Sequence, residues 1–136
     1  LYLSAFIIRE KDEYYELLKN VTTLGKWRPW IIYILRAIEE TSKYTISKIE
    51  EIDRLFSRTT EIVNEKYPSI RKEFIEKLFE QPYISPKKLL DKNAKSLNTV
   101  KKYLKQLEEI GLLVPEKIGK EIVYLNIDLF NILSES

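Results

Sequence analysis

The chain reads SLNTVKKYLKQLEEIGLL at residues 96–113 and continues at once with VPEKIGKEIVYL. In the first stretch, apolar residues recur every three or four positions as far as Leu107, which is the pattern of an amphipathic helix. Ser96 is a typical N-cap residue, and Gly111 is placed to end the helix. The next residues alternate between apolar and polar around Gly119, which predicts a two-stranded hairpin.

Two shorter helices are predicted before this one, and a last short helix after the hairpin. The segment RKEFIEKLFEQP has one apolar face and ends at Pro82, and SPKKLLDKN starts with Ser85 as N-cap and Pro86 as first helical residue. IDLFNIL follows the hairpin. This order resembles the winged helix-turn-helix domains. We expect an independently stable domain at residues 68–136, with a core formed by Phe74, Leu78, Leu89, Leu90, Val100, Leu104, Leu107 and Leu113.

In DNA-binding winged-helix domains the third helix enters the major groove and the wing contacts the backbone. The candidate nucleic-acid contacts are polar residues of the third helix and the wing: Ser96, Asn98, Thr99, Lys101, Lys102, Lys105, Lys117 and Lys120. Their lysines supply charge for phosphates, and their hydroxyl and amide groups bond phosphates or base edges. No Arg, the commonest base reader, lies in the helix or the wing. Three interpretations of this surface stay open. It binds DNA sequence-specifically, it contacts nucleic acid weakly and non-specifically, or it is the solvated face of a domain that packs against protein.

The charge is unevenly distributed along the chain. Residues 1–70 carry 11 basic and 11 acidic residues, whereas residues 82–125 carry 9 basic and 5 acidic residues, out of a total net charge of +2. The net charge of the whole chain therefore does not point to a polyanion partner, and the basic excess lies in the winged-helix segment. DNA, bound weakly, is therefore the partner that the charge of this segment suggests.

Several chemistries are excluded by composition. The chain has no His and no Cys, so it contains no His general base, no disulfide and no thiolate metal site. Cysteine usage fits a cytoplasmic protein. No apolar run reaches the roughly 18–20 residues of a membrane span, so we expect no membrane partner. The sequence also lacks Met and begins in an apolar stretch with no helix cap before it. We therefore expect the chain to be a fragment of a longer protein.

The N-terminal half is predicted to be helical throughout. Residues 1–10 are the tail of a buried helix with Leu3, Phe6 and Ile7 on one face. A second helix starts with Asp12 as N-cap and ends at Gly25. Pro29 is placed as the first residue of a third helix.

No Gly or Pro occurs between residues 30 and 67, and the apolar residues keep helical spacing. We expect one long linker helix that joins two bodies. The alternatives are two collinear helices with a break near EETSKYT, or a three-helix bundle with a turn at residues 41–44. YPSI at 67–70 is the first firm break, so the domain boundary is placed between residues 67 and 68.

Five short motifs resemble the Fic family of proteins. They are LYLSAFII at the start, YYELL (14–18), GKWRPW (25–30), AIEETS (37–42) and IGKEIVYLN (118–126). They occur in the family's order, so the resemblance covers all 136 residues. It implies a mainly α fold: the end of the Fic helical domain, a long linker helix, and a winged helix-turn-helix domain with a small β-hairpin wing.

The resemblance also implies an activity for the parent protein. Fic proteins typically transfer AMP from ATP, with Mg²⁺, to a Ser, Thr or Tyr hydroxyl of a target protein. Their signature HPFx[DE]GNGR supplies the general base, the metal ligand and the phosphate-binding turn. The signature is absent from this sequence, so we expect no catalytic or metal-binding residue in the chain and place the active site upstream.

One helix of the chain is expected to contact the nucleotide. By position in the family, Tyr15, Leu18 and Thr22 flank the adenine, although many members have Asn where Thr22 stands. An aromatic ring and a Leu at i and i+3 suit a purine. The alternative is that these side chains pack in the core of the domain and do not contact a nucleotide.

Two hypotheses on function result. In the first, the chain is the inert C-terminal part of a Fic-family adenylyltransferase whose partner is a target protein. In the second, it is a winged-helix transcription regulator with a helical dimerisation arm. Its homodimer seam would lie at residues 45–63, where apolar and Thr residues alternate in steps of four and three.

Overall fold

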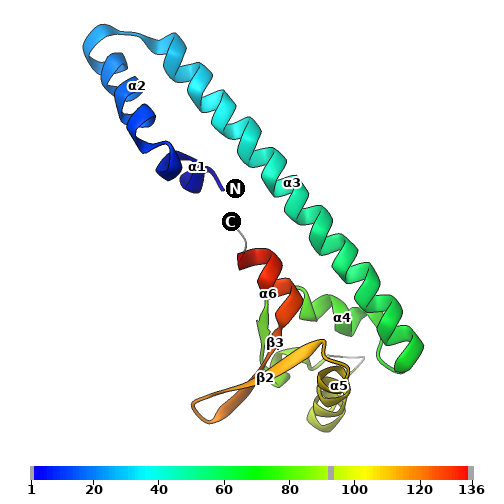
Figure 1. Cartoon of the computed structure of the whole chain (residues 1–136). Helices are drawn as coiled ribbons and strands as arrows, with labels where there is room; N and C mark the ends of the chain where they lie inside the picture. Colours follow the sequence, from blue (N-terminus) through cyan, green and yellow to red (C-terminus); the bar gives the residue numbers. More distant parts are fainter. Residues whose placement is uncertain (1, 92–93, 135–136) are drawn as a thin grey trace. The chain divides into compact units, whose positions relative to one another are not determined.

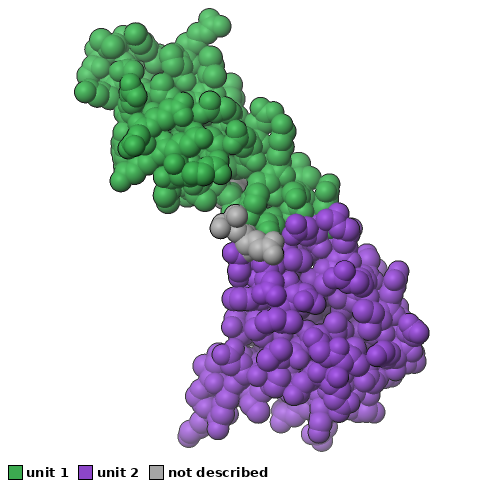
Figure 2. All heavy atoms as spheres, in the orientation of Figure 1, with its two compact units in different colours: residues 1–50 green, residues 51–136 purple. Residues whose placement is uncertain are grey.

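A computed structural model describes residues 2–91 and 94–134 (Figure 1). The fold is mainly α with a small antiparallel sheet, as the sequence predicts. The elements are α1 (Leu3–Arg9), α2 (Lys11–Leu24), α3 (Trp27–Lys66), α4 (Lys72–Leu78), β1 (Tyr83–Ile84), the 3-10 helix η1 (Pro86–Leu89), α5 (Leu97–Glu109), β2 (Leu113–Ile118), β3 (Glu121–Asn126) and α6 (Ile127–Ser134). They form two compact units, residues 1–50 and 51–136 (Figure 2).

The long helix is confirmed. α3 is unbroken over 40 residues, so neither a break near EETSKYT nor a turn at residues 41–44 occurs. Pro29 is the third residue of α3 and not the first, a position that needs no backbone donor because the first-turn N–H groups have no helical partner. Within the described ranges, no helix is long and apolar enough to cross a membrane.

Unit 1 has a small core between α1, α2 and the first part of α3. Phe6, Tyr33 and Ala37 are buried there. The predicted N-cap at Asp12 is wrong: α2 starts at Lys11, and no side chain caps its first turn. Gly25 ends α2 as predicted, in a left-handed conformation with φ of 65°.

One arginine joins these helices. The Nη2 of Arg36 in α3 donates hydrogen bonds to Glu10 and Glu13 at 3.2 Å each, and its guanidinium lies 5.6 Å from the centre of the Tyr33 ring. Each of these partly exposed ion pairs contributes less than about 1 kcal/mol. Together they fix the orientation of α2 against the first half of α3.

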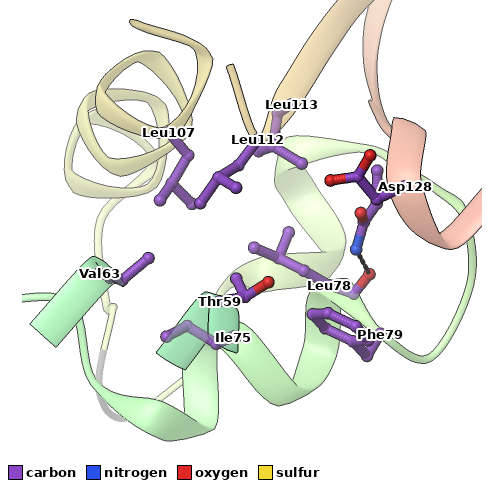
Figure 3. A pocket seen from close by; sticks show the side chains of 10 residues that line it. Thr59, Val63, Ile75, Leu78, Phe79, Leu107, Leu112, Leu113 and Asp128 are labelled. Atoms are coloured by element: carbon purple, nitrogen blue, oxygen red, sulfur yellow. Dashed lines mark hydrogen bonds between the residues drawn. The ribbon is translucent and has the colours of Figure 1, made fainter. Parts of the chain in front are cut away.

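The core of unit 2 includes the last turns of α3. Val63 is fully buried and packs with the core of the winged helix, against which Phe56 is also packed. Figure 3 shows Thr59 and Val63 pointing into the same space as Ile75 and Leu107. The compact unit therefore begins inside α3, at residue 51, whereas the sequence placed the boundary at the helix end before Pro68.

The winged-helix elements follow in the predicted order, with two differences. η1 is a single 3-10 turn, and Leu90 after it is extended and 40% exposed, so its predicted place in the core is wrong. Leu89 alone is buried there. Residues 92 and 93, which the sequence assigns to the end of this helix, lie outside the described residues.

The sheet has three strands in the order β1-β3-β2, all antiparallel. The β2–β3 hairpin is the predicted wing. β1 pairs Tyr83 with Leu125 and Ile84 with Tyr124, and the sequence did not predict it because two residues carry no periodic signal. Lys77 of α4 pairs with Asp91 at 2.7 Å, and Asp91 accepts a hydrogen bond from the Ala94 N–H, which fixes the approach to α5.

Asn126 connects three elements of unit 2. Its buried side chain donates from Nδ2 to the Leu78 carbonyl of α4 at 3.3 Å, the bond drawn in Figure 3, and its Oδ1 accepts from the Leu129 N–H of α6 at 3.4 Å. Its backbone N–H donates to the Pro82 carbonyl at 2.8 Å. The Asn126 amide therefore holds the last helix on the winged helix.

We expect a fragment of residues 51–136 to unfold cooperatively in urea, whereas a fragment of residues 69–136 does not. The shorter fragment lacks Val63 and Phe56 and exposes apolar core residues of α4 and α5 to water. Circular dichroism during a urea titration measures this. Equal cooperativity and equal midpoints for the two fragments would place the boundary at residue 67 after all.

We expect Asn126→Ala to lower the free energy of unfolding by about 1–3 kcal/mol, because the substitution leaves buried backbone groups without partners. The matched control is Asn131→Ala, which changes an exposed amide of α6. Its effect should stay within about 0.5 kcal/mol. If both variants lose the same stability in urea titrations, the Asn126 hydrogen bonds do not hold α6.

Candidate functional site

Among the described residues, the structure offers two candidate surfaces, one in each unit. One pocket in the core of unit 2 encloses about 10 Å³ (Figure 3). That is near the least volume that admits one water molecule, so this pocket belongs to the core. Among residues 2–91 and 94–134, no three His, Cys, Asp or Glu side chains are placed to hold a metal ion.

The predicted adenine-flanking residues lie on an open side of α2. Tyr15 is 57% exposed, Leu18 is half-buried, and Thr22 is exposed with its hydroxyl donating to the Leu18 carbonyl at 3.2 Å. The core of unit 1 uses a neighbouring stripe of the same helix, Tyr14 and Leu17. Tyr15, Leu18 and Thr22 are therefore not the core stripe, and they present a ring and an aliphatic chain at the surface.

Aromatic packing holds Tyr15 in place from one side. The rings of Tyr14 and Tyr15 meet edge to face at 5.4 Å, and the Tyr14 ring lies 5.3 Å from Trp30 of α3. Lys11 Nζ lies 6.0 Å from the centre of the Tyr15 ring. The outer part of the Tyr15 ring stays open to solvent, as stacking on a purine requires.

The core beneath this surface contains the buried hydroxyl of Tyr33, which the sequence did not single out. It is 2% exposed, and its oxygen has no hydrogen-bond partner among the described residues. Burial raises the pKa of Tyr33 above its ordinary value, and the carboxylates of Glu10 and Glu13 raise it further. The hydroxyl therefore stays protonated at neutral pH and acts as part of the aromatic core.

The second surface is the basic side of α5 and the wing. Asn98, Lys101, Lys102 and Lys105 are exposed on α5, as the sequence predicts. Lys117 and Lys120 are exposed near the tip of the wing. Lys87 and Lys88, which were not among the predicted contacts, are exposed on η1, the element packed next to α5.

Two of the predicted nucleic-acid contacts have a local role. Ser96 Oγ accepts the Thr99 N–H at 3.1 Å and lies 2.9 Å from Thr99 Oγ1, so the pair caps α5. Such a cap stabilises a helix by about 1 kcal/mol. The lysines and Asn98 are the groups of this surface that remain directed at solvent. Flexible ammonium groups bind phosphates as point charges and lack the bidentate fork that reads guanine.

The acidic end of α5 limits the extent of the basic surface. Glu108 and Glu109 lie in its last turn. Burial raises the pKa of Tyr124 on the sheet, and the Glu108 carboxylate raises it further, so the Tyr124 hydroxyl stays neutral beside the end of α5. The positive charge is therefore concentrated on the first three turns of α5, on η1 and at the wing tip.

One comparison with known proteins bears on unit 2. Residues 55–129 match the family model described as "Protein adenylyltransferase SoFic-like, C-terminal domain". The match covers more than half of the chain. It starts within α3, four residues after the start of unit 2, and ends in α6.

We expect the chain to bind random duplex DNA weakly, with an affinity that falls steeply as salt rises, because each neutralised phosphate releases counterions. Replacing Lys101, Lys102 and Lys105 with Ala should flatten the slope of log K against log salt by up to about 2.7, at about 0.9 per lost contact. A salt titration by fluorescence anisotropy measures the slope.

The matched control replaces three exposed lysines of other elements, Lys19, Lys26 and Lys66, and should leave the slope unchanged. Selection from a randomised duplex pool tests the lack of sequence preference. We expect no duplex to be preferred by more than about tenfold, which is about 1.4 kcal/mol and less than a good bidentate contact gives. A strong consensus sequence would contradict this expectation.

Proposed function

The chain belongs to the SoFic-like family of protein adenylyltransferases, and we propose that it is the C-terminal part of an enzyme that transfers AMP from ATP to hydroxyl side chains of target proteins. The observation that carries the proposal is the family match over unit 2. The Fic-like motifs of residues 1–50 support it independently, because they lie outside the matched range.

In this proposal the reacting groups lie outside the chain. The sequence has no His to act as general base and lacks the HPFx[DE]GNGR signature. Among the described residues, no three His, Cys, Asp or Glu side chains lie together to hold a metal ion. The contribution of this chain is then limited to positioning: unit 1 borders the nucleotide site, and unit 2 is an accessory domain.

Within unit 1, Tyr15, Leu18 and Thr22 are the residues we assign to the adenine. The open ring of Tyr15 supplies a stacking surface, and Leu18 one turn later extends it with an aliphatic chain. The Thr22 hydroxyl donates to the Leu18 carbonyl, so its methyl group and the lone pairs of its oxygen are free to contact a ligand.

The first half of α3 has an exposed apolar face, which supports packing against another part of the same enzyme. Large apolar side chains occupy one face of this helix and are between 41% and 60% exposed: Trp27, Ile31, Leu35, Ile38, Ile46 and Ile49. At 100° per residue they fall within an arc of about 100°. A contiguous apolar face of this length marks an interaction surface. We assign it to the catalytic part of the adenylyltransferase.

The proposal predicts that Tyr15→Ala in the complete enzyme raises the KM for ATP by about fivefold to a hundredfold, since aromatic stacking on a base contributes about 1–3 kcal/mol. Tyr15→Phe keeps the ring and should retain the parental KM. Transfer of AMP from α-labelled ATP to protein measures both. An unchanged KM in Tyr15→Ala would remove Tyr15 from the nucleotide site.

The proposal also predicts that the chain of 136 residues alone does not label proteins with AMP. The complete reading frame should encode HPFx[DE]GNGR a few dozen residues before Leu1, and its product should label proteins. AMP transfer by the isolated chain above a buffer control would overturn the assignment of catalysis to the missing part.

A winged-helix transcription regulator is the second candidate, and the exposed lysines of α5 and the wing favour it. Its homodimer seam at residues 45–63 is only partly free, because Thr59 and Val63 are buried in unit 2 while Ile49 is 60% exposed. A start codon at or just before Leu1, together with a consensus DNA site, would favour this candidate over the enzyme.

A further inference from the structure

The register of the sheet in unit 2 separates two faces of the wing. Directly paired residues of an antiparallel sheet point to the same face. Leu113 pairs with Asn126, and Ile84 pairs with Tyr124; all four are buried in or packed against the core, so they mark the inner face. The residues between them in each strand point to the opposite side, because side chains alternate along a strand.

This opposite side carries a continuous set of apolar residues. Val114 and Tyr83 both pair with Leu125, one on each side of it, and Val123 lies two residues before Leu125 on the same strand. Such neighbours lie about 5–8 Å apart. The Tyr83 ring contacts Phe130 of α6 with centroids 6.1 Å apart. We call Tyr83, Val114, Ile118, Val123 and Phe130 the outer wing patch.

The outer wing patch is open to solvent even though α6 covers its base. Leu125, at its centre, is only 8% exposed, whereas Tyr83, Val114 and Phe130 around it are 36% to 44% exposed. Ile118 near the wing tip is 59% exposed. Isolated exposed apolar residues are common on proteins, but a contiguous set on a projecting hairpin is typical of an interaction surface.

The charges around the outer wing patch are acidic. Glu116 pairs with Val123 and Glu121 pairs with Ile118, so both carboxylates share the outer face. Lys117 instead pairs with Ile122 on the inner side of the hairpin. The two sides of the wing therefore differ in sign of charge, although they are formed by the same twelve residues of β2 and β3.

We propose that the outer wing patch, with Glu116 and Glu121, docks a basic amphipathic segment of another protein. Apolar side chains of the partner cover Val114, Ile118 and Tyr83, and its Lys or Arg side chains face the carboxylates at the rim. This docking does not depend on AMP transfer.

The charge pattern argues against other occupants. Nucleic acid is repelled by Glu116 and Glu121, because a phosphate would meet two carboxylates on this face. A second copy of the chain related by a two-fold axis presents the same acidic rim to its mate. A basic segment is the occupant whose charge complements the face.

The experiment uses the full ¹⁵N-labelled chain and two helical probe peptides, one built of Leu and Lys and the other of Leu and Glu in the same pattern. Amide shifts are followed at residues 83, 114, 118, 123 and 130. We expect the Leu–Lys peptide to shift these amides in a saturable way, more strongly at low salt, and the Leu–Glu peptide to leave them unchanged.

The matched variants lie on the same hairpin. Ile118→Ser on the outer face should weaken the titration by about tenfold, or about 1.4 kcal/mol, while Ile122→Ser on the inner face should change it by less than about twofold. The proposal fails if both variants weaken it equally, if Leu–Glu binds as well as Leu–Lys, or if the outer-wing amides stay unshifted while those of α3 saturate. A dimer in sedimentation that Ile118→Ser dissociates would assign the patch to a second copy and also overturn it.

Discussion

The packing of the last turns of α3 against α4 and α5 is the contact on which the rest of unit 2 depends. Val63 is fully buried in that core, and Thr59 beside it is nearly so. Without this helix the winged helix has one face of its core open to water, because Val63 and Phe56 pack on α4 and α5 there. A domain of this size has little apolar burial to spare, because the buried fraction of the surface falls as domains become smaller. The family match also supports a domain that starts within α3, since it begins at residue 55 and not after Pro68.

Much of the fold follows from local sequence. The absence of Gly and Pro predicts α3, Gly25 predicts the end of α2, and Ser96 with Gly111 brackets α5. The features that were missed depend on residues far apart in the chain. The two-residue strand β1 exists only through its pairing with β3. The start of unit 2 inside α3 depends on tertiary contacts, whereas Pro68 marks only the end of a helix.

The candidate sites could be predicted only in part, for the same reason. On α2, periodicity does not separate the stripe of Tyr15 and Leu18 from that of Tyr14 and Leu17, and only packing shows that the second one is the core. The exposed lysines of α5 follow from amphipathic spacing. The outer wing patch was not predictable, because the strand register and the contact of Tyr83 with Phe130 decide which side chains lie together.

The central claim is that the matched domain includes the end of α3 as one cooperative unit. Native-state hydrogen exchange of the full chain tests this most directly, because amides of one cooperative unit share one opening free energy. The account predicts that the slowest amides of residues 55–63 and of residues 100–107 open with the same free energy and the same dependence on denaturant. Opening of residues 55–63 together with residues 27–50, while residues 100–107 stay protected, would contradict it.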